Sequence, residues 1–191
     1  MRTTFSTPIH LAHHFWTLHY SIAHHDGIVI DATCGNGKDA FFLACLLQGS
    51  TTPLWCIDIQ EISISHTKSL LSTHPHKDHI HFLHGSHTEL PKEPIQLIVY
   101  NLGYLPKGDK RITTMTTSSI ISIQNALSLL APEGLISIIC YSGHAEGARE
   151  AAAILELASS LAPSTWCVTH MTWPNRNQAP SLLLITKDAS H

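Results

Sequence analysis

The sequence predicts an α/β fold in which a mostly parallel, seven-stranded sheet carries helices on both faces. Short apolar segments typical of buried strands alternate with longer segments of helical periodicity. The 191 residues are 43% hydrophobic, which is enough for one complete core. Right-handed crossovers between parallel strands place the intervening helices on both sides of the sheet. We therefore expect a single domain over residues 1–191.

The first element is a predicted helix that begins at Thr7, a capping residue followed by Pro8, and ends near Ala23. Residues 1–25 should pack on the sheet through the apolar side chains of Ile9, Leu11, Phe15, Trp16, Leu18 and Ile22. The predicted strands are 28–31, 54–58, 80–83, 95–100, 135–141, 165–171 and 182–186. The other predicted helices are 39–48, 61–72, 116–130 (ended by Pro132 and Gly134) and 146–161 (ended by Pro163).

Composition excludes several classes of protein. Charged residues make up 13% and the formal net charge is −3, so a nucleic-acid surface would have to be local. No segment is long and apolar enough for a membrane helix, and the N-terminus lacks a signal-peptide pattern. The five cysteines are scattered without a Cys-x-x-Cys pair, which favours a reducing cytoplasm. The 16 histidines lack an accompanying cysteine or acidic ligand set, so we expect no structural metal.

A cofactor pocket is predicted where the strands end, because ligands of such sheets bind at the carboxyl ends of the strands. Asp31 ends the first predicted strand and Asp58 the second. The Asp31 carboxylate could accept hydrogen bonds from the amino group of S-adenosylmethionine (SAM), and Asp58 from its ribose hydroxyls. Ile59 could pack on the adenine. The full set of predicted cofactor contacts is Asp31, Thr33, Gly35, Asn36, Gly37, Asp39, Asp58, Ile59, Gln60, Ser86, His87, Asn101 and Gly103.

Two other interpretations use the same residues. Gly35-x-Gly37-x-x-Ala40, with Asp58 about 20 residues on, also satisfies a relaxed NAD fingerprint. Against NAD, Asp31 would face the pyrophosphate unfavourably, and the polar segment after the fourth strand is typical of a methyl-acceptor loop. Alternatively, Asp31 and Asp58 only cap neighbouring helices. A non-catalytic nucleotide-binding module is a further alternative, although it would not need an acceptor loop.

The segment after the fourth predicted strand begins Asn101-Leu-Gly103-Tyr104-Leu-Pro106. It resembles the Asn-Pro-Pro-Tyr loop of amino-directed methyltransferases. In such a loop the asparagine accepts hydrogen bonds from the target nitrogen and the aromatic residue stacks on the base. These contacts hold the amine lone pair in line with the methyl group.

The chain as a whole resembles the small bacterial class I SAM-dependent methyltransferases named putative rRNA methylases, which have a Rossmann-like fold. The matching segments are residues 31–39, 58–60, 85–87, 101–110, 112–114, 141–147 and 177–180. Characterised members methylate the amine of 5-aminomethyl-2-thiouridine at the tRNA wobble position, giving the 5-methylaminomethyl form. The resemblance therefore implies a tRNA-modifying enzyme, with rRNA or another amine as the alternative acceptor.

The resemblance also implies roles for individual residues. Those expected to act in catalysis are Asn101, Tyr104, Asp109 and His144, with Asp109 or His144 taking the amine proton. Those expected to contact the substrate are Tyr104, Pro106, Lys107, Lys110, Arg111, Tyr141 and Arg176. The chain departs from the family pattern at Ser142, Ala145 and residues 178–179. We expect tRNA as the partner and a possible homodimer that would help to span a tRNA arm.

Overall fold

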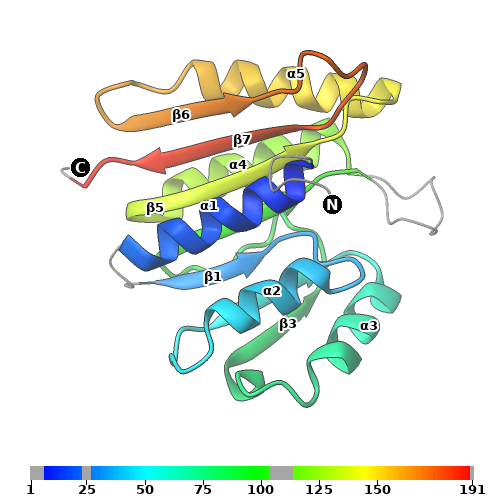
Figure 1. The fold of residues 1–191 in the computed structure, drawn as a ribbon, viewed down its shortest axis with the longest axis vertical. Helices are drawn as coiled ribbons and strands as arrows, with labels where there is room; N and C mark the ends of the chain where they lie inside the picture. Colours follow the sequence, from blue (N-terminus) through cyan, green and yellow to red (C-terminus); the bar gives the residue numbers. More distant parts are fainter. Residues whose placement is uncertain (1–6, 23–26, 104–113, 190–191) are drawn as a thin grey trace.

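The computed structural model describes residues 7–22, 27–103 and 114–189. It confirms a seven-stranded sheet covered by helices, with strand order β3-β2-β1-β4-β5-β7-β6 (Figure 1). The strands are β1 (Ile28–Asp31), β2 (Leu54–Asp58), β3 (Ile80–His84), β4 (Ile95–Asn101), β5 (Leu130–Cys140), β6 (Trp166–Met171) and β7 (Ser181–Lys187). The helices are α1 (Pro8–Ile22), α2 (Lys38–Leu46), α3 (Glu61–Leu71), α4 (Thr116–Leu129) and α5 (Ala145–Ser159), with a 3-10 turn at Lys77–His79.

The direction of the strands decides where a ligand can bind. Strands β1 to β5 pair in parallel, so their carboxyl ends share one edge of the sheet. The chain reverses its order of strands between β1 and β4, which is the switch point where such sheets bind ligands. Strand β7 is antiparallel to both β5 and β6. Its start at Ser181 pairs with Cys140, so the β6–β7 connection returns to the same edge.

The core consists of two apolar clusters, one on each face of the sheet. Helices α1, α2 and α3 contribute to one cluster, and helices α4 and α5 to the other. Figure 1 shows α1 and α2 in front of the sheet and α4 behind it. Because side chains alternate along a strand, Leu97 and Val99 of β4 join the first cluster, whereas Ile98 and Tyr100 join the second. Strands β1, β4 and most of β5 are therefore buried on both faces.

Two details of the predicted elements were wrong. In α1, Leu11 and Trp16 are buried as expected, but Leu18 and Ile22 are 47% and 75% exposed. Leu18 follows Trp16 by two residues, roughly 200° around the helix, and therefore points to solvent together with Ile22 one turn later.

The fifth strand begins at Leu130 rather than Leu135, immediately after α4 ends. Pro132 and Gly134 thus lie within the strand instead of simply ending the helix. They stand where the register against β4 shifts, and the intervening Glu133 has a φ of 61°. The turn residues produce a bulge at the start of the strand, which the sequence pattern alone did not distinguish from a loop.

None of the helices in the described ranges is long and apolar enough to cross a membrane.

Candidate cofactor and acceptor site

The predicted cofactor residues converge where β1, β2 and β4 end. Asp58, the last residue of β2, accepts hydrogen bonds from the backbone N–H of Gly35 (2.9 Å) and of Gln60 (2.8 Å). The Thr33 hydroxyl accepts the backbone N–H of Asn101, the last residue of β4, at 2.8 Å. The turn after β1 is therefore bound to the ends of both neighbouring strands, and it presents its backbone to the switch point.

Asp31 is the most unusual group in this site. It is 1% exposed, and its Oδ1 accepts one hydrogen bond from the Thr33 N–H at 3.2 Å. Its Oδ2 is buried and has no hydrogen-bond partner among the described residues. Burial raises the pKa of Asp31 well above its ordinary value and the negative charges of Asp39 and Asp58 raise it further, whereas the backbone N–H groups of Thr33 and Ala40 lower it in part. Such a carboxylate needs a cationic partner to stay ionised, and the ammonium group of SAM fits that need.

The turn between β1 and α2 requires its glycines. Gly37 caps α2 with a φ of 76°, and a Cβ there would lie 2.9 Å from the Thr67 hydroxyl. Asn36 at the tip of this turn is exposed. Cys34 in the same turn is buried, and burial raises the pKa of its thiol, so it is poorly suited to act as a nucleophile.

The turn after β3 lies beside Asp58, as expected for the adenine side of the pocket. The Gly85 N–H donates to the backbone carbonyl of Asp58 at 3.0 Å. Ser86 accepts the Thr88 N–H at 3.2 Å, which fixes the turn. Burial lowers the pKa of His87, so its ring is neutral at physiological pH. Ile59 is 64% exposed and remains available for contact with a ring.

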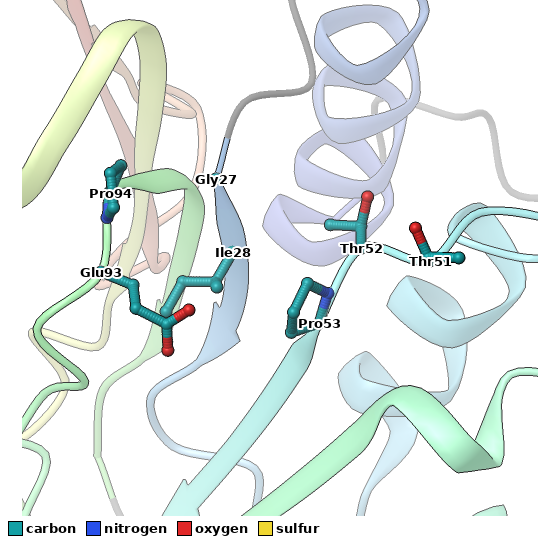
Figure 2. Close-up of a pocket in the computed structure, with 7 residues that line it drawn as sticks. All are labelled: Gly27, Ile28, Thr51, Thr52, Pro53, Glu93 and Pro94. Carbon is teal, nitrogen blue, oxygen red and sulfur yellow. The ribbon is translucent and has the colours of Figure 1, made fainter.

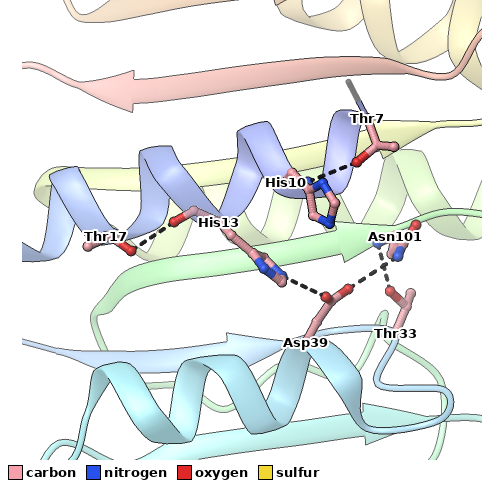
Figure 3. Close-up of polar contacts among 7 residues, drawn as sticks. All are labelled: Thr7, His10, His13, Thr17, Thr33, Asp39 and Asn101. Carbon is pink, nitrogen blue, oxygen red and sulfur yellow. Dashed lines mark hydrogen bonds and ion pairs between the residues drawn. The ribbon is translucent and has the colours of Figure 1, made fainter. Parts of the chain in front are cut away.

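Asp39 lies between the cofactor turn and the acceptor residue (Figure 3). Its Oδ2 accepts a hydrogen bond from Nδ2 of Asn101 at 3.2 Å, and its Oδ1 is 2.9 Å from Nε2 of His13. Asp39 was predicted as a cofactor contact, whereas His13 was not predicted as a site residue at all. No local pattern could have identified His13, because the two paired residues are 26 positions apart in the sequence.

Two hydrogen bonds join Gly103 and Thr114, the described residues at the two ends of the predicted acceptor loop. The Gly103 N–H donates to the Thr114 hydroxyl at 2.9 Å, and the Thr114 N–H donates to the Gly103 carbonyl at 3.0 Å. The Thr114 hydroxyl in turn donates to Glu150 of α5 at 2.9 Å. The loop residues between them that carry predicted roles, Tyr104, Pro106, Lys107, Asp109, Lys110 and Arg111, lie outside the described residues.

Two predicted substrate residues, Tyr141 and Arg176, and the predicted catalytic residue His144 lie at the same edge of the sheet. Tyr141 follows β5 beside Gly103, and burial together with the charge of Asp39 raises the pKa of its hydroxyl. His144 caps α5, because its Nδ1 accepts the Gly147 N–H at 3.0 Å. A neutral ring that accepts at Nδ1 carries its proton on Nε2. Arg176 is exposed in the β6–β7 connection.

The family departures also lie at this edge. Ser142 and Ala145 flank the His144 cap, and Gln178, with a φ of 52°, belongs to the β6–β7 connection.

The described part of the chain also has a hollow away from the predicted site. It has a volume of about 330 Å³. Its lining residues, drawn in Figure 2, are Gly27, Ile28, Thr51, Thr52, Pro53, Glu93 and Pro94. It lies where β1, β2 and β4 begin, at the edge opposite the predicted site. Among the described residues, no group of three or more His, Cys, Asp or Glu side chains could hold a metal ion. His74 instead contacts Cys45 at 3.5 Å, and His76 contacts the Thr52 carbonyl at 3.0 Å.

Known proteins are similar to this chain both in sequence and in the arrangement of strands and helices. Residues 54–187 match the family described as "Putative rRNA methylase". The chloroplastic tRNA (mnm5s2U34)-methyltransferase of Arabidopsis thaliana is 32% identical over an alignment of 171 residues that covers 83% of this chain and 62% of that protein. The chain therefore spans less than two thirds of the length of this relative.

Two solved structures cover almost the whole chain. A putative rRNA-methylase from Clostridium thermocellum has a TM-score of 0.88 and 29% identity, and the match covers 97% of this chain and 100% of that one. A putative methyltransferase from Streptococcus mutans in complex with SAH has a TM-score of 0.81 and 26% identity, with 98% and 99% coverage.

The strand order also separates this fold from the NAD-binding one, in which a parallel sixth strand follows the fifth. Here the antiparallel β7 lies between β5 and β6. The chain belongs to the family described as putative rRNA methylases, and it has the Rossmann-like fold of its solved relatives, one of which is a putative methyltransferase in complex with SAH.

Proposed function

We propose that this enzyme methylates the primary amine of 5-aminomethyl-2-thiouridine at the wobble position of tRNA. One observation carries the proposal: the side chain of Asn101, a hydrogen-bond acceptor suited to an amine, lies at the end of β4 beside the acidic cofactor pocket. The 32% identity to a relative named tRNA (mnm5s2U34)-methyltransferase supports the choice of acceptor.

The residues of the first turn would hold the cofactor. Asp31 would bind the amino group through its unpartnered Oδ2, and Asp58 would accept the ribose hydroxyls through its remaining lone pairs. Ile59 would cover the adenine from its exposed position. When bound, SAM supplies a methyl group on a positively charged sulfur. The acidic pocket favours that positive charge.

On the acceptor side, Asn101 would orient the amine through its side-chain carbonyl. The amine must lose a proton before it can react, because an ammonium has no lone pair. Burial raises the pKa of Tyr141, so its hydroxyl is protonated at neutral pH and cannot begin the reaction as a base. The Nδ1 atom of His144 is engaged at the start of α5. Asp109 is therefore our preferred proton acceptor.

RNA would contact the edge of the sheet that carries the site. Arg176 and Trp173 belong to the β6–β7 connection at this edge. The basic residues of the acceptor loop, Lys107, Lys110 and Arg111, would add phosphate contacts. A cytoplasmic location and a homodimer stay predictions.

The test uses total tRNA from cells that lack their own wobble-uridine methyltransferase. The purified chain is incubated with this tRNA and SAM, and the nucleosides are analysed by mass spectrometry. We expect 5-aminomethyl-2-thiouridine to gain one methyl group, and Asn101→Ala to lose this activity while Asp78→Asn, an exposed acid away from the site, keeps it. Methylation of rRNA from the same cells, with the wobble nucleoside unchanged, would contradict the proposal and favour the alternative acceptor.

A further inference from the structure

One side chain of the first helix reaches the predicted site. His13 lies in the middle of α1, and its Nε2 is 2.9 Å from Oδ1 of Asp39 (Figure 3). The His13 ring stacks on Phe42, with 3.8 Å between the ring centroids and 13° between the planes. It also lies against Trp16, with centroids 4.8 Å apart. Two aromatic neighbours therefore fix the ring in the orientation that meets Asp39.

The other oxygen of Asp39 determines how the Asn101 amide is turned. An ionised carboxylate can only accept hydrogen bonds, whereas an amide offers an NH₂ group at one end and a carbonyl oxygen at the other. Asp39 therefore selects the NH₂ end, which donates to its Oδ2 at 3.2 Å. The Oδ1 atom of Asn101 must then point away from Asp39. This is the orientation that an acceptor of amine hydrogen bonds requires.

His13 stabilises the orientation of the Asp39 carboxylate that selects the NH₂ end of Asn101. A carboxylate group rotates in a broad two-fold well about its last torsion. A donor on each oxygen restrains that rotation, and His13 and Asn101 provide one partner each. The side chains of His13 and Asp39 are only 22% and 12% exposed, so water competes weakly for these hydrogen bonds.

We propose that His13 and Asp39 are positioning residues that hold the Asn101 amide with its carbonyl oxygen toward the acceptor amine. The first helix thereby becomes part of the acceptor site as well as a cover for the sheet. The kinetic consequence rests on the proposed function, whereas the orientation of the amide can be tested without any substrate.

The kinetic test compares variants at two adjacent histidines of α1, with SAM and the hypomodified tRNA as substrates. His13→Leu removes the partner of Asp39, and kcat should fall about tenfold, the factor that corresponds to one lost hydrogen bond to a charged group. His13→Gln keeps an N–H donor at a similar distance and should stay close to wild type. His14→Leu changes an exposed neighbour and should have no effect. Asp39→Ala should lower kcat about 100-fold, because the amide is then free to turn.

Two further readouts separate positioning from simple stabilisation. If His13 acts by positioning, His13→Leu should lower kcat, whereas the KM for tRNA and the midpoint of thermal unfolding should change little. A lower unfolding midpoint with unchanged kcat would mean that His13 serves only to pack α1, and it would overturn the inference. Failure of His13→Gln to restore kcat would also overturn it, because the hydrogen-bond donor would then be irrelevant.

The orientation is measured directly by NMR of the ¹⁵N-labelled side-chain amides in the protein without substrate. The Asn101 resonances are assigned by their loss in Asn101→Ala. We expect them to move in His13→Leu and Asp39→Ala and to stay in place in His14→Leu. Resonances that do not move in either of the first two variants would refute the positioning role. If the wild type transfers no methyl group to the tRNA but the resonances move, the proposed function fails and the positioning of Asn101 stands.

Discussion

Replacement of Asp31 by asparagine should stabilise the ligand-free protein and weaken its binding of SAM. The wild-type carboxylate is buried, one of its oxygens has no hydrogen-bond partner among the described residues, and burial raises its pKa. A folded-state pKa above the unfolded value means that this group is stabilising only at low pH, and that this contribution is lost as the pH rises through the folded pKa. At neutral pH the Asp31→Asn variant avoids the free-energy cost of a buried negative charge, while its side-chain oxygen still accepts the Thr33 N–H.

The size of both effects can be estimated. Removal of the unpaired negative charge, with a neutral NH₂ group in the place of Oδ2, should raise stability by about 1 kcal/mol, which for a chain of this size corresponds to about 2–4 °C in the unfolding midpoint. Loss of a hydrogen bond to a charged group costs about 1.5–3 kcal/mol, or roughly 10- to 150-fold in Kd. At a SAM concentration of about 100 times the wild-type Kd, the wild type gains about 2.7 kcal/mol from ligand, whereas a variant that binds roughly 50-fold more weakly gains about 0.65 kcal/mol.

Thermal unfolding with and without SAM at neutral pH measures both quantities, and calorimetric titration gives Kd. The wild-type midpoint should rise by about 5–10 °C on addition of SAM, and the variant midpoint by only about 1–3 °C from a higher starting value. Asp78→Asn, an exposed acid in the turn before β3, is the matched control and should behave as wild type. A variant that is less stable without ligand, or that binds SAM with unchanged Kd, would refute the assignment of Asp31 as the residue that holds the amino group.

Three further predictions concern reactivity, pH and capping. Iodoacetamide at neutral pH should label the exposed Cys45 and Cys167 but not Cys34, whose thiol pKa is raised by burial, and peptide mass spectrometry would contradict this if Cys34 were modified first. Because burial raises the pKa of Glu150, wild type should lose stability relative to Glu150→Gln as the pH rises above the ordinary glutamate pKa, and unfolding midpoints that run parallel with pH would count against it. His144→Ala should lose about 1 kcal/mol of stability through the missing cap, with His144→Asn restoring it; loss of methyl transfer in both variants would instead favour a proton-acceptor role.

The order of strands and helices could be predicted from the sequence because each element has a local pattern of apolar and turn residues. The fully buried β1 and β4 appear as short apolar runs, and α5 is stopped by Pro163 soon after its last turn. Asp31 and Asp58 were predicted as neighbours for a topological reason, since the carboxyl ends of parallel strands share one edge.

Contacts between segments that are distant in the sequence could not be predicted from local patterns. The pairing of His13 with Asp39 depends on how α1 crosses the sheet, and the periodicity of one helix does not determine that crossing. The link from Glu150 to Thr114 likewise joins α5 to the end of the acceptor loop across 36 positions. The cap formed by His144 uses a residue that is rare among capping residues, so its chemistry suggested catalysis before its geometry was known.

The three carboxylates at the candidate site differ in how many hydrogen bonds they accept, and this difference is the one that the proposed amine methylation would need. Asp58 accepts two backbone N–H groups and Asp39 is engaged by His13 and Asn101, whereas Asp31 keeps one buried oxygen without a partner among the described residues. The carboxylate that lacks a partner therefore lies on the proposed cofactor side, where the cationic SAM would be bound. On the acceptor side, a bare carboxylate would hold the substrate amine in its protonated form. Hydrogen bonds to both oxygens of Asp39 weaken that effect, so in the proposed reaction the acceptor amine would lose its proton more readily beside Asn101.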